Sequence, residues 1–69
     1  MHRTAVSSSN VASIGYDRDA VTLEVEFVNG SVYQYFDVPE HVYDQLMQAS
    51  SKGAYLNEHV KDSYRYAKI

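Results

Sequence analysis

Two segments of β-strand character joined by Asn29 and Gly30 constrain the fold of this 69-residue chain more than any other feature. Residues 21–27, VTLEVEF, carry apolar side chains at every second position. Such alternation is typical of a strand with one buried face. An Asn-Gly pair between two such segments is the strongest short-range signal of a β-hairpin. We therefore predict a hairpin whose second strand covers residues 31–37.

The length of the hairpin loop decides which face of the sheet carries Tyr33 and Tyr35. A two-residue type I′ turn pairs Phe27 with Val32 and leaves both tyrosines on the outer face, beside the acidic side chains of the preceding strand. A three-residue loop, formed by a type I turn and a G1 bulge, shifts the pairing by one residue. Both tyrosines then turn toward the core.

We favour the bulged loop, which places Gly30 in the left-handed region where glycine is well tolerated. In this register Val25 pairs with Tyr33. The shorter turn would instead bury Gln34 opposite Val25 with its amide unpaired, and burial of an unpaired amide is unfavourable.

A further strand is predicted before the hairpin. Residues 11–16, VASIGY, have the apolar and β-branched content of a short strand, and residues 17–20 form a loop. A four-residue loop keeps the apolar faces of both strands together. The expected register pairs Tyr16 with Val21, Ile14 with Leu23 and Ala12 with Val25.

Two helices are predicted after the hairpin. Residues 38–50 form the longer one, with Pro39 in its first turn, where the missing N–H has no cost. Its apolar stripe consists of Val42, Leu46 and Ala49. Ser51 caps a second, short helix that runs through residues 54–61. Residues 62–69 close the chain as an extended segment or a fourth strand.

The predicted order is β-β-β-α-α-β, an α+β fold. It comprises a small antiparallel sheet of three to four strands, with one longer and one short helix packed on one face. Residues 1–69 form a single domain. The absence of cysteine excludes disulfides and thiolate metal sites. There is no apolar run of about 20 residues and no secretory signal, so we expect a cytoplasmic protein with no membrane partner.

Four segments, in order and spacing, resemble the KTSC domain family: VSSSNVASIGYD, LEVEFVNGSVYQYFDVP, VYDQLMQASSKGAYLNEHVK and YRYAKI. That family takes its name from lysyl-tRNA synthetase, because it follows the C-terminus of some of those enzymes, and it also occurs as short bacterial proteins. Its hallmark is a central Tyr-x-Tyr, matched here by Tyr33 and Tyr35. The resemblance therefore also favours the bulged loop, and the association with the synthetase implies RNA binding.

No residue pattern indicates catalysis. The three histidines, His2, His41 and His59, have no metal-site spacing. None of the serines has an adjacent base and orienting group, and no glycine-rich phosphate loop is present. We therefore expect a domain that is not an enzyme and needs no cofactor or metal.

Charge and tyrosines together indicate a binding site near the C-terminal end. The net charge is −3, but residues 1–51 hold two basic against seven acidic residues, whereas residues 52–69 hold four basic against two acidic. Bases stack on tyrosine rings, and cationic side chains neutralise phosphates. The candidate RNA-binding residues are Lys52, Tyr55, Lys61, Tyr64, Arg65, Tyr66 and Lys68.

Weak RNA binding is thus the first expectation. A protein-interaction, or docking, module is the alternative, because tyrosine-rich surfaces also suit protein partners. The charged residues around the exposed tyrosines distinguish the RNA-binding hypothesis from the docking hypothesis. Tyrosines among lysine and arginine favour RNA, whereas tyrosines among Glu24, Glu26 and Asp37 favour a protein partner.

Overall fold

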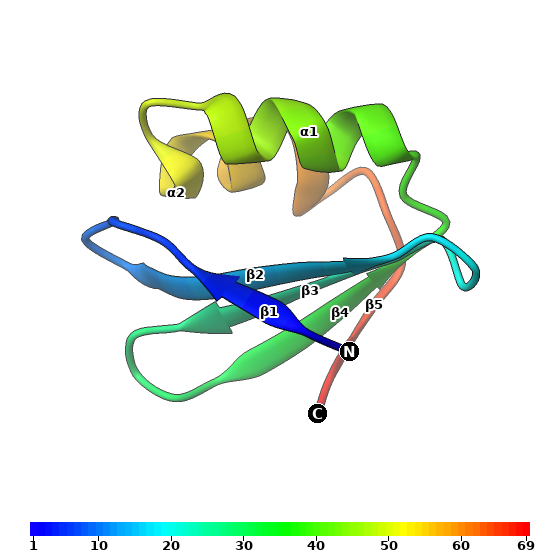
Figure 1. Ribbon diagram of the computed structural model, residues 1–69, viewed down its shortest axis with the longest axis horizontal. Coiled ribbons are helices and arrows are strands. Elements are labelled where there is room, and N and C mark those ends of the chain that lie inside the picture. The colour runs from blue at the N-terminus through cyan, green and yellow to red at the C-terminus, as the bar shows by residue number, and fades with distance from the viewer.

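The computed structural model describes residues 1–69 as one antiparallel sheet with helices on one of its faces (Figure 1). The five strands lie in the order β1-β2-β3-β4-β5, so each strand pairs with its neighbour in sequence. The strands are β1 Arg3–Ala5, β2 Val11–Asp17, β3 Thr22–Phe27, β4 Val32–Phe36 and β5 Tyr66–Lys68. The helical segments are α1 Glu40–Gln48, α2 Lys52–Tyr55 and the π-helical η1 Leu56–Val60. The α+β class is as predicted, with five strands instead of three or four.

The hairpin between β3 and β4 has the bulged loop. The Phe27 N–H donates to the Ser31 carbonyl (2.8 Å), the Gly30 N–H donates to the Phe27 carbonyl (2.9 Å), and Gly30 has φ of +92°. Val25 lies opposite Tyr33 as a result, and the predicted register is confirmed. The family hallmark pair therefore faces the helices.

The register between β2 and β3 differs from the prediction by two residues. Tyr16 pairs with Leu23 and Ile14 with Val25, because Val21 belongs to the turn and not to the strand. Val21 has φ of +53°, which is unfavourable for a β-branched residue. The shift of two preserves the apolar face, which explains why alternation alone did not reveal it.

A bulge near the start of β2 corrects a second prediction. The register shifts between Val11 and Ser13, so Val11 pairs with Phe27 and is fully buried. The predicted pair of Ala12 with Val25 is wrong because Val25 pairs with Ile14, and the bulge places Val11 instead of Ala12 opposite Phe27.

Helix α1 is shorter than the predicted 38–50, and the second helical run begins two residues before the predicted residue 54. Helix α1 begins after Pro39, which occupies the N-cap position, and Val42 and Leu46 are its buried residues. Ser51 caps α2 as predicted, since its hydroxyl accepts the Ala54 N–H (3.2 Å). From Leu56 the winding changes to π-helical.

The core lies between the sheet and the helices. Its buried apolar members are Val11, Ile14, Leu23, Val25, Tyr35, Val38, Val42, Leu46, Leu56 and Val60. None of the helices is long and apolar enough to cross a membrane.

The opposite face of the sheet carries an ion pair that the sequence did not reveal. Arg3 on β1 reaches across Gly15 to the Glu24 carboxylate (2.7 Å), and Gln34 donates to the other oxygen of Glu24 (2.8 Å). A side chain at residue 15 would collide with β1, since a Cβ there lies 2.6 Å from the His2 carbonyl oxygen. Glu24 is buried beneath these groups, not solvated as its alternation suggested.

Candidate functional site

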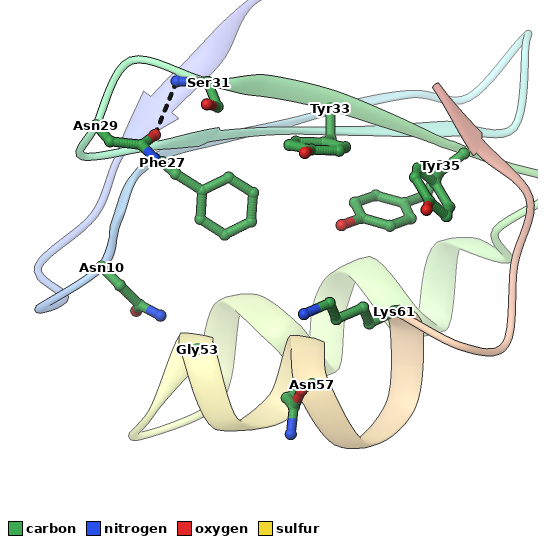
Figure 2. A pocket seen from close by; sticks show the side chains of 10 residues that line it. Asn10, Phe27, Asn29, Ser31, Tyr33, Tyr35, Gly53, Asn57 and Lys61 are labelled. Atoms are coloured by element: carbon green, nitrogen blue, oxygen red, sulfur yellow. Dashed lines mark hydrogen bonds between the residues drawn. The ribbon is translucent and has the colours of Figure 1, made fainter. Parts of the chain in front are cut away.

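A cavity of about 420 Å³ lies between the sheet and the α2–η1 segment (Figure 2). The sheet side contributes aromatic rings from β3, β4 and β5, and the helical side contributes Gly53, Asn57 and Lys61. The ten lining residues are Asn10, Phe27, Asn29, Ser31, Tyr33, Tyr35, Gly53, Asn57, Lys61 and Tyr66. None of them is acidic.

Three tyrosines form the aromatic wall of the cavity. Tyr35 pairs directly with Tyr66 across β4 and β5, with ring centroids 6.0 Å apart. The Tyr33 ring lies 6.4 Å from that of Tyr35 and 5.9 Å from that of Tyr66. Phe27 meets Tyr33 edge-on at 5.8 Å. Tyr66 is 58% exposed, so this wall opens to solvent.

Tyr35 differs from the other two because it is only 4% exposed. Burial, followed by the neighbouring phenols of Tyr33 and Tyr66, raises the pKa of Tyr35 above its ordinary value of 10.0. Its hydroxyl therefore stays protonated at neutral pH and is available as a hydrogen-bond donor.

Positive charge lies near these rings, and no carboxylate lines the cavity. Lys61 extends from the end of η1 into the cavity, opposite Tyr33 and Tyr35 (Figure 2). Lys68 pairs with Tyr33 in the sheet and so projects from the same face. Glu24 and Glu26 occupy the opposite face, where both carboxylates lie within ion-pair distance of Arg3.

The seven candidate residues do not form one cluster. Lys61 and Tyr66 line the cavity, and Lys68 lies on the same sheet face. Tyr64 packs against the core, and Lys52 donates to the Ala49 carbonyl (2.8 Å).

Tyr55 and Arg65 are also separate from the cavity. The Tyr55 hydroxyl donates to Gln45 (2.9 Å), and its ring lies 4.6 Å from the His59 ring at a tilt of 40°. Arg65 pairs with Asp37 (2.9 Å) and covers the Phe36 ring. For Arg65 the separation follows from alternation, because Arg65 and Tyr66 are consecutive, whereas Tyr55 lies in helix α2.

The polar rim of the cavity was not found by sequence reasoning. Asn10, Asn29 and Ser31 are loop residues, and their positions depend on the β2 bulge and the hairpin loop. The Asn10 side chain lies against Gly53, where a Cβ would be 2.5 Å from its Oδ1 atom. No sequence pattern indicates that contact, which joins the loop before β2 to helix α2, far apart in the chain.

Comparison with known proteins places this architecture in a family. Residues 7–64 match the KTSC domain. The chain belongs to the KTSC domain family. A crystal structure of a KTSC domain protein from Yersinia pestis has a TM-score of 0.93 and 42% identity, covering 99% of this chain and 96% of that one. The five-stranded sheet and its helices are therefore the KTSC fold.

Sequence relatives of this KTSC domain are of two kinds. A protein of Stutzerimonas stutzeri (strain A1501) is 43% identical over the whole chain and 99% of its own length. A lysine–tRNA ligase of Nostoc punctiforme is 36% identical over 88% of this chain, which corresponds to 11% of the ligase. A lysine–tRNA ligase of Trichormus variabilis is 41% identical over 78% of this chain and 10% of its own length.

Proposed function

We propose that this KTSC domain is a cytoplasmic RNA-binding module, not an enzyme, that holds single-stranded RNA weakly in its aromatic cavity. The observation that carries the proposal is the position of Tyr33, Tyr35 and Tyr66 around one cavity with Lys61 and without a carboxylate. Unpaired bases stack on tyrosine rings, and sheet faces are common platforms for such stacking. A nearby ammonium group suits the phosphate that accompanies each base.

The distribution of charge favours RNA over a protein partner. Exposed Tyr66 has Lys61 and Lys68 as its charged neighbours on this face, whereas Glu24 is engaged by Arg3 on the other face. The related ligases support the same choice, because a segment similar to this chain belongs to enzymes named for joining lysine to tRNA. Tyrosine rings near lysines match the recognition of bases and phosphates.

A docking module remains the second candidate, and one observation favours it. Strand β5 is an edge strand, and the neighbouring Ile69 is 64% exposed. An extended peptide could add to such an edge through main-chain hydrogen bonds, with apolar contacts for specificity. This mode would leave the cavity unused, so it predicts a different set of perturbed residues from the RNA proposal.

The number of cations predicts weak binding with a shallow salt dependence. Lys61 and Lys68 neutralise about two phosphates, so the slope of log affinity against log salt is about −1.4, at about −0.7 per contact for single strands. The measurement is an NMR titration of the isotope-labelled domain with short single-stranded RNA at low salt. Shifts are expected at Tyr33, Tyr66 and Lys61.

Two variants that each remove one positive charge test the location. Lys61→Met should weaken RNA binding several-fold, whereas Arg65→Met should leave it unchanged because Arg65 projects from the other face. The Arg65 pair is highly exposed, so its loss should alter stability by less than about 1 kcal/mol. The RNA proposal fails if millimolar RNA causes no shifts. Shifts along the β5 edge with a peptide would make docking the better account.

A further inference from the structure

The Tyr35 hydroxyl makes no hydrogen bond within the chain and is open to the cavity that the residue lines. The residue as a whole is 4% exposed. Two other tyrosines of this domain do have partners. The Tyr16 hydroxyl donates to the Val38 carbonyl, and the Tyr55 hydroxyl donates to Gln45. The Tyr35 hydroxyl is therefore a free donor and acceptor that a ligand in the cavity can reach.

The rim amides of the cavity also have unused hydrogen-bonding groups. Asn29 accepts the Ser31 N–H through its side-chain oxygen, which leaves its NH₂ group free (Figure 2). Asn10 accepts from Ser8 and likewise keeps its NH₂ group free. Asn57 makes no side-chain bond, and its side chain is exposed. The cavity therefore combines flat aromatic walls with donors and acceptors at several edges.

The volume and charge of the cavity limit what it can hold. About 420 Å³ is near the lower end of small-molecule sites, which suits one ring system with its substituents and not a longer segment. Lys61 is the one charged side chain among the ten lining residues, so an anionic group at the ligand's edge is favoured. A planar heterocycle carrying a phosphate satisfies both conditions.

We propose that the cavity accepts one unpaired nucleotide, with its base against the rings of Tyr33 and Tyr66, an acceptor of the base on the Tyr35 hydroxyl, and its phosphate near Lys61. This inference rests on the RNA-binding function proposed above and defines its unit of recognition as a single nucleotide. A free ribonucleoside monophosphate should then occupy the site without any neighbouring nucleotides. The Tyr35 hydroxyl recognises the base edge through a hydrogen bond. The tyrosine rings stack on the base and accept any base, because every base has an aromatic face.

The experiment is a set of NMR titrations of the intact domain with AMP, GMP, CMP and UMP, each compared with ribose 5-phosphate and inorganic phosphate. At least one nucleotide should give saturable shifts at the cavity residues. Ribose 5-phosphate should bind at least tenfold more weakly, because it lacks the stacking base. Equal shifts with ribose 5-phosphate or inorganic phosphate would overturn the proposal in favour of a simple anion site.

A crossed pair of hydroxyl deletions tests the role of Tyr35. Tyr35→Phe should weaken the best nucleotide about fivefold, the usual value of one hydrogen bond, without lowering the melting temperature, because no protein hydrogen bond is lost. Tyr16→Phe should do the reverse, lowering the melting temperature and leaving affinity unchanged, because its hydroxyl bonds Val38 away from the cavity. If Tyr35→Phe binds the nucleotide with unchanged affinity, the Tyr35 hydroxyl does not bond the base. Should Tyr35→Phe unfold, Lys61→Met must weaken the nucleotide but not the corresponding nucleoside.

A parallel titration with a short single-stranded RNA separates this inference from the function on which it rests. RNA that binds while no mononucleotide does would overturn the single-nucleotide cavity and leave RNA binding standing. RNA shifts that avoid Tyr33, Tyr35 and Lys61 would do the same. No shifts with either ligand would remove both proposals.

Discussion

Replacing Arg3 by methionine removes the cation that is paired with the buried Glu24 carboxylate. Breaking a fully buried ion pair costs about 3–5 kcal/mol, and breaking an exposed pair costs about 0–1 kcal/mol. The Glu24 side chain is 8% exposed and that of Arg3 is 30% exposed, so this pair lies between the two limits. Gln34 still donates to one Glu24 oxygen. We therefore expect Arg3→Met to lower the free energy of unfolding by about 2 kcal/mol.

Urea unfolding measures this loss against a control of the same geometry. For a slope of about 1 kcal/mol/M, the midpoint should fall by about 2 M. Arg18 pairs with Glu40 at the same 2.7 Å distance, but their side chains are 73% and 42% exposed. Arg18→Met should therefore cost less than about 1 kcal/mol.

A double-mutant cycle isolates burial of the charge as the cause. In Arg3→Met with Glu24→Gln, no buried unpaired carboxylate remains, because the other partner of Arg3, Glu26, is 35% exposed, so the double variant should be more stable than Arg3→Met alone. Losses that simply add, or an Arg18→Met loss as large as that of Arg3→Met, would refute the reasoning.

Three further changes test other parts of the fold. Leu46→Ala should cost about 2–5 kcal/mol because Leu46 is fully buried, and a circular dichroism melt like that of the parent would contradict this. Val21→Asn should raise the melting temperature by a few degrees, because asparagine tolerates φ of +53° better than valine, and a lower melting temperature would show that valine's contacts outweigh its backbone strain. The contribution of Tyr35 to stability should be constant below about pH 10 and be lost above it, because burial raises the folded pKa of Tyr35, so the unfolded chain loses that proton first. Tyr35→Phe should reduce the slope of this alkaline loss in pH-dependent urea unfolding, and an unchanged slope would exclude Tyr35 as its source.

The parts of the fold that depend on local periodicity were predictable. Asn29 and Gly30 defined the hairpin, and the unfavourable burial of Gln34 selected the register that turns Tyr33 and Tyr35 inward. The helix stripe followed from the spacing of Val42 and Leu46 in the same way. For the hairpin, the wrong alternative would have exchanged buried and exposed faces, and the family's Tyr-x-Tyr hallmark favoured the same register.

The errors arose where tertiary structure overrides local preference. Val21 adopts a left-handed conformation that its β-branched side chain disfavours, and no propensity predicts that. Strand β1 has only three residues, two of them exposed, so it shows no alternation to recognise. Arg3 is positioned there by its pairing with Gly15. Short edge strands of this kind become evident only through their partner.

The candidate site was only partly recoverable from the sequence. Alternation in residues 64–69 already placed Arg65 on the face opposite Tyr66, so grouping them by sequence proximity overlooked an available signal. By contrast, the contact between Asn10 and Gly53 joins a loop to the distant helix α2, and Lys61 reaches the tyrosines through the packing of η1 over the sheet. Such convergence depends on the assembled layers.

Strand β5 couples the integrity of the cavity to a local equilibrium. It has three residues, all exposed, and pairs only with β4, so its detachment should require much less free energy than global unfolding. Detachment carries away Tyr66 and opens one wall of the cavity. Only molecules with β5 attached are then competent to bind, and a ligand that contacts Tyr66 selects that population. Amide hydrogen exchange at Tyr66–Lys68 should therefore slow as ligand fills the cavity. The protection of these β5 amides then measures the fraction of molecules that hold a ligand.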